Sequence, residues 1–166
     1  MDGSVDFEAF CLRHHTALLR LLTLYCGDRE LARDLTQETL ARVWLHWRKV
    51  ARMDRPDLWA KRVALNLANS QFRHRRLERS RRHLLVEGPL EPAFDAGSRV
   101  FVEQVLSGLT ARQRTAVLLR FLEDLSVEQT SELMGCSQGT VKKLTARALV
   151  ELRARVGAEI EVDTDA

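Results

Sequence analysis

Two capped helices on either side of a glycine turn, within residues 125–152, constrain this chain most. Ser126 precedes Gln129 at the spacing of a capping box, which begins a helix. Gly135 suits a left-handed helix stop, and Ser137 suits the start of the next helix. Two helices joined by such a turn predict a helix-turn-helix, whose second helix fits the major groove of DNA. A plain helical hairpin inside an all-α core is the alternative.

The second helix of this motif has two contrasting faces. Its apolar residues recur at helical spacing and predict a buried face: Val141, Leu144, Ala148, Leu149, Leu152 and Val156. The other face is small, polar and basic, and a helix N-terminus favours phosphate. The candidate DNA-binding residues of this helix are Ser137, Gln138, Thr140, Lys142, Lys143 and Arg147.

Three further helices are predicted in the first half of the chain, over 6–26, 28–50 and from Pro56 to about 83. In the second of these, Trp44 lies about half a turn from the apolar face that contains Leu35. A tryptophan among polar groups is typical of a partner-binding surface. A second packing contact within the same domain is the alternative.

The third helix is strongly basic from Lys61 to Arg82, with eight lysines and arginines against one acid, Glu78. Guanidinium and amide side chains recur along one line of it: Arg62, Asn66, Asn69, Arg73 and Arg76. This pattern favours contact with a nucleic-acid backbone, and an ordinary solvated face is the alternative.

Composition and the positions of helix-breaking residues indicate the domain organisation. A hydrophobic content of 45% in 166 residues permits one ordinary core or two small ones. Prolines, glycines and acids over 84–100 indicate a flexible linker, and the acidic residues 158–166 indicate a disordered tail. We therefore predict an all-α protein with two small helical domains, 1–83 and 101–157, the second containing the helix-turn-helix.

Several function classes are disfavoured by the residues present. Cys11, Cys26 and Cys136 lack the spacing of a zinc site or a disulfide framework. No phosphate-binding glycine loop or nucleophile–base pair is visible, so we expect no enzyme, cofactor or metal. With no leader and no apolar run of about 18 residues, we expect a cytoplasmic protein without membrane insertion.

Two motifs in this order resemble those of extracytoplasmic-function (ECF) RNA polymerase sigma factors, closest to the actinobacterial SigE-like group. Residues 27–44 read GDRELARDLTQETLARVW, and residues 134–143 read MGCSQGTVKK. The resemblance covers nearly all of 6–156 and implies a subunit that directs RNA polymerase core to promoter DNA. Many members of this family are also held by an anti-sigma factor.

The resemblance implies a task for each surface. The helix-turn-helix would bind the −35 element. The loop 51–55 and the helix after it would read and open the −10 element through Arg52, Asp54, Arg55, Lys61, Arg62, Asn66, Asn69 and Arg73. The second helix would bind the polymerase through Asp34, Leu35, Gln37, Glu38, Leu40 and Trp44.

This chain departs from the family at a few positions. The common family run TVKSR reads TVKKL at 140–144, and the usual acid before Asp34 is Arg33. Two other functions fit the residues: a stand-alone helix-turn-helix transcriptional regulator, and a protein-binding adaptor. The regulator would bind duplex DNA without polymerase, whereas the adaptor would show no salt-dependent affinity for DNA.

Overall fold

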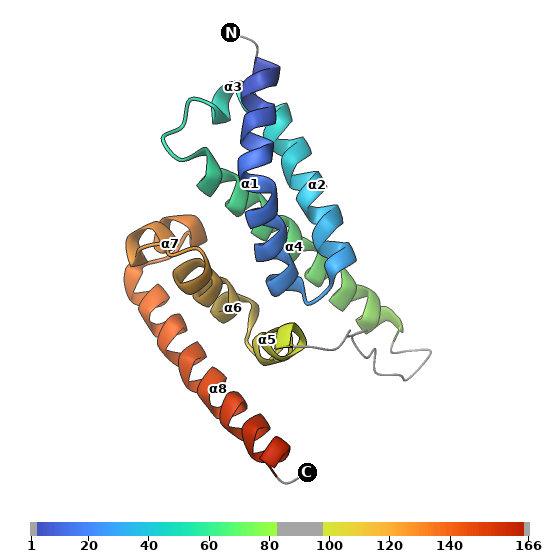
Figure 1. Cartoon of the computed structure of the whole chain (residues 1–166), viewed down its shortest axis with the longest axis vertical. Helices are drawn as coiled ribbons and strands as arrows, with labels where there is room; N and C mark the ends of the chain where they lie inside the picture. Colours follow the sequence, from blue (N-terminus) through green and yellow to red (C-terminus); the bar gives the residue numbers. More distant parts are fainter. Residues whose placement is uncertain (1–2, 83–97, 165–166) are drawn as a thin grey trace. The chain divides into compact units, whose positions relative to one another are not determined.

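A computed structural model describes residues 3–82 and 98–164, and all the regular elements in these ranges are helices (Figure 1). The chain divides into two compact units, residues 1–93 and 94–166. Unit 1 contains α1 (Gly3–Cys26), α2 (Arg29–Leu45), α3 (Trp47–Val50) and α4 (Pro56–Arg82). Unit 2 contains α5 (Ser98–Ser107), α6 (Ala111–Val117), the π-helical turn η1 (Leu118–Leu122), α7 (Val127–Met134) and α8 (Gln138–Thr164). The all-α prediction is confirmed.

The core of unit 1 forms where α1 packs against α2 and α4 (Figure 1). Its largest fully buried side chains on α1 are Leu18, Leu21, Leu22 and Tyr25. The turn from α1 to α2 follows the local prediction, because Gly27 adopts a φ of +66° that favours glycine. Asp28 then accepts the backbone N–H of Leu31 at 3.0 Å and begins α2.

The single helix predicted over 28–50 is wrong, because α2 ends at Leu45 and α3 begins at Trp47. His46 between them has φ −110° and ψ 11°, outside the helical conformation. Trp47, the first residue of α3, is buried in the core, where its ring centroid lies 5.3 Å from that of Phe7 and 5.3 Å from that of Phe10. Burial of this large aromatic side chain stabilises the bend and sets the path into the loop 51–55.

Unit 2 is assembled on α8, which contacts α5, α6 and α7. Thr110 and Gln113, which have the sequence spacing of a capping box, form one at the start of α6. Gln113 also donates to Glu151 of α8 at 3.1 Å. The Arg114 guanidinium donates to the carbonyls of Leu106, Ser107 and Leu109 at 3.0–3.2 Å, which satisfies the C-terminal end of α5.

The turn η1 departs from the predicted core pattern. Helical spacing in the sequence predicts that Phe121 is buried with Val117, Leu118 and Leu125, yet its side chain is 58% exposed. A π-helical turn accommodates an extra residue, so the side chains that follow are rotated relative to an α-helix. Asp124 then adopts a φ of +50°, a conformation that aspartate tolerates better than most residues.

Two segment predictions have mixed outcomes. Of the predicted linker, residues 84–97 lie outside the described residues, whereas 98–100 belong to α5. The predicted disordered tail is wrong over 158–164, because α8 continues to Thr164. The acidic residues of this segment do not interrupt the helix begun at Gln138, since aspartate and glutamate lack the backbone constraint of proline.

Candidate functional site

The outer face of α2 is available to a partner. Trp44 is 48% exposed, and the predicted polymerase-binding residues Asp34, Gln37 and Glu38 are also exposed. Leu40 is half-buried. Leu35 is 3% exposed, so it lies in the core between α2 and its neighbours and not on the predicted polymerase-binding surface. The position of Leu35 follows from its helical spacing with the buried residues of α2.

A groove lies along this face, and half of its lining comes from α1. Its volume is about 510 Å³, and its lining consists of Phe7, Glu8 and Cys11 from α1 with Leu40, Ala41 and Trp44 from α2. The Phe7 ring centroid lies 4.9 Å from that of Trp44, which holds the indole at the edge of the groove. Helical spacing in the sequence puts Phe7 and Cys11 on the core-facing stripe of the first helix and does not predict their part in this groove. Their spacing, which matches that of Leu40 and Trp44, was the available signal.

The members of the predicted row on α4 differ in exposure. Arg62, Asn66 and Arg73 are exposed. Asn69 is half-buried, and its side-chain oxygen accepts the Tyr25 hydroxyl at 2.6 Å. Tyr25 is fully buried, so this bond fixes Asn69 against α1. The side chain of Arg76 lies outside the described residues.

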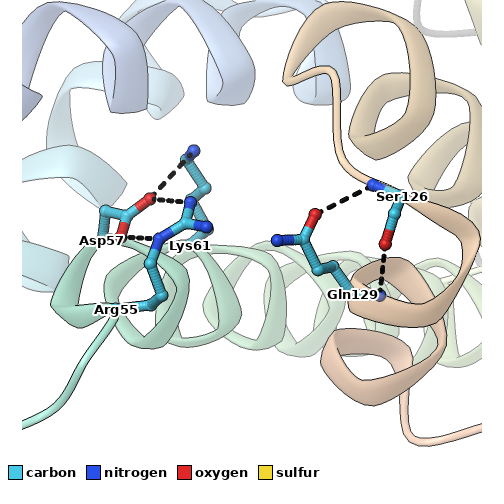
Figure 2. Close-up of polar contacts among 5 residues, drawn as sticks. All are labelled: Arg55, Asp57, Lys61, Ser126 and Gln129. Carbon is cyan, nitrogen blue, oxygen red and sulfur yellow. Dashed lines mark hydrogen bonds and ion pairs between the residues drawn. The ribbon is translucent and has the colours of Figure 1, made fainter.

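Lys61 and Arg55 both meet Asp57 near the start of α4 (Figure 2). Asp57 accepts two hydrogen bonds from the Arg55 guanidinium, from Nε at 3.0 Å and from a terminal nitrogen at 2.9 Å. The Lys61 ammonium lies 3.7 Å from the same carboxylate, and its side chain is only 11% exposed. Lys61 is therefore a buried partner of Asp57 and not the surface phosphate contact that the sequence predicts.

Electrostatics at this site favour an ionised Asp57. Burial acts to raise the pKa of Asp57, but the hydrogen bonds and charge of Arg55 and the charge of Lys61 outweigh it and lower the pKa below its ordinary value. Nearby on α1, burial lowers the pKa of His14, an effect that the Asp57 charge opposes. The remaining loop candidates, Arg52 and Asp54, are exposed.

The helix-turn-helix forms as its residues predict. Ser126 accepts the Gln129 backbone N–H at 3.0 Å and donates its own backbone N–H to the Gln129 side chain at 2.9 Å (Figure 2). Gly135 closes α7 with φ +61° and ψ 43°. Ser137 then accepts the Thr140 backbone N–H at 3.2 Å and begins α8.

The exposed face of α8 carries the predicted DNA-binding residues. Gln138, Lys142, Lys143 and Arg147 are exposed, and Thr140 is half-buried with its hydroxyl 2.9 Å from that of Ser137. Lys143 and Arg147 are one helical turn apart, so they share a face. Within residues 3–82 and 98–164, no ion pair involves Lys142, Lys143 or Arg147.

The described residues offer neither a metal-binding cluster nor a membrane-spanning helix. No group of three or more histidine, cysteine or acidic side chains among them could hold a metal ion. None of the helices in the described ranges is long and apolar enough to cross a membrane.

Comparison with known proteins identifies both units. The family model "Sigma-70 region 2" matches residues 10–78, and "Sigma-70, region 4" matches residues 102–152. The RNA polymerase sigma-E factor of Streptomyces coelicolor is 34% identical over 95% of this chain and 90% of its own. That of Streptomyces avermitilis is 31% identical over 90% and 84%. The chain therefore belongs to the sigma-70 family, within the SigE-like group of ECF RNA polymerase sigma factors.

Solved structures agree with this assignment. The sigma factor RpoE of Bartonella quintana, in complex with the anti-sigma factor NepR, matches with a TM-score of 0.77 and 25% identity. The match covers 92% of this chain and 97% of that protein. CnrH, in complex with the cytosolic domain of CnrY, shares the fold with a TM-score of 0.67 and 22% identity over 92% and 88% of the two chains.

Proposed function

We propose that this sigma factor binds core RNA polymerase and directs it to promoters by recognising the −35 and −10 elements and assisting strand opening. The observation that carries this proposal is a separation of surfaces in a chain of this family. An exposed tryptophan-centred face on α2 suits a protein partner, and polar, basic faces on α4 and α8 suit DNA. The chain acts as an initiation factor and leaves the chemistry of RNA synthesis to the polymerase.

The −35 contact is assigned to the start of α8. Ser137 and Thr140 lie where the helix N-terminus favours phosphate oxygens. Lys143 and Arg147 point to base edges or flanking phosphates from the same face, and Gln138 and Lys142 extend it. A bidentate contact between one of these side chains and a base contributes about 1–3 kcal/mol of discrimination.

The −10 contact is assigned to the loop 51–55 and the exposed residues of α4. Strand opening requires cations that hold displaced phosphates and a pocket for an unstacked base. Arg52, Arg62 and Arg73 supply positive charge along this surface, and Asn66 supplies amide donors and acceptors suited to a base edge. Asp54 belongs to the loop, and Asn69 lies further along α4, where its side-chain oxygen accepts the Tyr25 hydroxyl.

The polymerase contact is assigned to the face of α2 and the adjoining groove. Trp44 and Leu40 form its apolar centre, and Asp34, Gln37 and Glu38 form a polar rim. Phe7 and Cys11 of α1 extend the apolar lining. We expect binding at this face to place the chain in the cytoplasm, where core polymerase and promoters meet. An anti-sigma factor is a further proposed partner, since the similar Bartonella quintana protein binds one.

Run-off transcription with purified core polymerase and selected promoter fragments tests this function. We expect transcripts that depend on both the added chain and an intact −35 and −10 sequence. Tight duplex binding without any promoter-dependent transcript would favour a stand-alone regulator instead. The absence of both core binding and salt-dependent DNA binding would favour a protein-binding adaptor.

A further inference from the structure

The segment made of α3 and the loop 51–55 is held at both of its ends by contacts with α4. Before the loop, the His46 ring centroid lies 5.7 Å from that of Trp59 on α4. After the loop, Asp57 accepts two hydrogen bonds from Arg55, the last loop residue, in a bidentate ion pair. The Arg55 carbonyl also accepts the backbone N–H of Leu58 at 3.2 Å. The conformation of this loop therefore depends on α4 as well as on its own turn.

The Asp57 side chain is more buried than its role as an acid in the first turn of a helix requires. An acid in the first turn of a helix is stabilised by the helix dipole even when it is fully exposed. The Asp57 side chain is only 16% exposed, whereas that of its partner Arg55 is 47% exposed. Lys61, one turn later, is also buried beside it. Asp57 thus connects a buried cation to an exposed guanidinium at the edge of the loop.

This geometry bears on whether Arg55 can bind a DNA phosphate. A guanidinium bound through two parallel hydrogen bonds is fixed in orientation. Its charge is also balanced by the carboxylate, so it attracts a phosphate less than an unpaired arginine does. In this arrangement Arg55 helps to fix the shape of the loop and is less suited to bind a phosphate.

We propose that Asp57 is a positioning residue for promoter selection: its carboxylate clamps Arg55 and thereby fixes the shape of the loop 51–55 that receives the −10 element. This inference rests on the proposed function. Asp57 itself need not touch DNA. Loosening such a supporting contact reduces discrimination between sequences more than it reduces general affinity.

The test compares variants in run-off transcription on promoters that differ only at single −10 base pairs. Each mismatch should reduce wild-type transcription about 5- to 150-fold. For Asp57→Asn we expect this ratio to fall by at least about half, toward a limit of 1 at which the two promoters are no longer distinguished. The log–log salt slope of promoter binding by the holoenzyme should also become more negative by about 0.9, because Arg55 is freed to meet a phosphate.

Two variants separate this effect from a general loss of structure. Arg55→Lys keeps both charges but removes the bidentate hydrogen bonding. This variant should therefore lose selectivity between −10 sequences without a steeper salt slope. It also serves if Asp57→Asn does not fold. Glu30→Gln, which removes an exposed acid from the first turn of α2, changes the net charge equally and should keep the wild-type ratio.

Three results would overturn the proposal. One is an unchanged mismatch ratio in Asp57→Asn and Arg55→Lys, even with transcripts from all promoters reduced equally, since that indicates a purely structural role. Another is an equal loss of selectivity in Glu30→Gln. The third, a wild-type chain that yields no promoter-dependent transcript, would remove the proposed function together with this inference, whereas the first two leave that function intact.

Discussion

The candidate DNA surfaces of the two units differ in how far their polar groups are already engaged. On α8, Lys143 and Arg147 are exposed, and no described ion pair involves them. On unit 1, Asp57 holds Arg55 and Lys61, and Tyr25 donates to Asn69. Long unpaired side chains lose conformational freedom when they bind, whereas held groups have lost it on folding. We therefore expect unit 2 to contribute mainly salt-sensitive affinity, and unit 1 to add shape selectivity to the positive charge of its exposed arginines.

The largest effect should come from the face of α2, which this comparison treats as separate from both DNA surfaces. The double substitution Leu40→Ala and Trp44→Ala should weaken binding to core polymerase by at least about 30-fold, because central apolar anchors dominate interface energies. Fluorescence anisotropy with labelled sigma factor measures this change. Leu45→Ala, an exposed aliphatic residue of the same helix, is the matched control and should bind normally.

If the Leu40/Trp44 variant binds core polymerase as well as the wild type does, the division of unit 1 into a protein face and a DNA face is wrong. A loss of binding to the −35 element by this variant would also contradict the separation of the α2 face from the DNA surfaces.

The next effect concerns the unpaired cations of α8. Lys143→Ala or Arg147→Ala should weaken binding of the holoenzyme to promoters with a −35 element by about 5- to 150-fold, the equivalent of one good base contact. Loss of one phosphate contact instead should reduce the magnitude of the log–log salt slope by about 0.9. Titrations at several salt concentrations distinguish these outcomes.

Arg153→Ala serves as the control for the α8 variants, since Arg153 is exposed on the same helix but lies outside the predicted site. Equal losses in Arg153→Ala and Arg147→Ala would indicate a diffuse positive field in place of a defined reading surface. Core polymerase binding should be unchanged in all three variants.

The features of the fold that follow from neighbouring residues were predictable. Gly27 and Gly135 occupy the left-handed stops, and Ser126 with Gln129 forms the capping box. The exposed position of Trp44 also follows from helical spacing alone. Each of these predictions depends on backbone preferences over one or two turns, which act before any tertiary contact forms.

The features that were missed arise from contacts between elements. The break at His46 lies beside Trp47, which packs against two phenylalanines of α1. Lys61 is buried beside Asp57, one turn earlier on α4, whereas in the sequence it reads as the first residue of a basic, solvent-facing stretch. The groove beside Trp44 needs Phe7 from another helix. Periodicity shows which face a residue lies on, but it does not show which side chain will meet it there.

A smaller effect tests whether Asn69 is a structural group of unit 1. Asn69→Ala should lower the free energy of unfolding by about 1–3 kcal/mol, because the buried Tyr25 hydroxyl loses this acceptor. Tyr25→Phe should cost about 0.5–1.5 kcal/mol, and the double variant less than the sum of the two. Tryptophan fluorescence in urea reports on unit 1 directly, since Trp44, Trp47 and Trp59 all lie there.

Lys143→Ala provides the contrast from unit 2 and should change stability by no more than about 0.5 kcal/mol. Additive effects of the Tyr25 and Asn69 substitutions would show that the two side chains are not coupled. In that case Asn69 belongs with the unengaged groups, and the comparison between the units weakens.

The smallest effect is the pH dependence of the Asp57 contact. Because the pKa of Asp57 is lowered in the folded state, its contribution to stability is present above the ordinary carboxyl pKa of 3.8 and is lost as the pH falls through the lower folded value. His14 acts at higher pH: burial lowers its pKa from 6.5, so stability decreases as the pH falls below that value.

Urea unfolding followed by tryptophan fluorescence from pH 7 to 3 should show both decreases in stability. Asp57→Asn should remove the lower one, a change of less than about 1 kcal/mol after solvent screening, and retain the upper one. A variant that follows the wild-type curve below pH 4 would mean that Arg55 and Asp57 are not joined in solution, and the loop would then resemble the unpaired surface of α8.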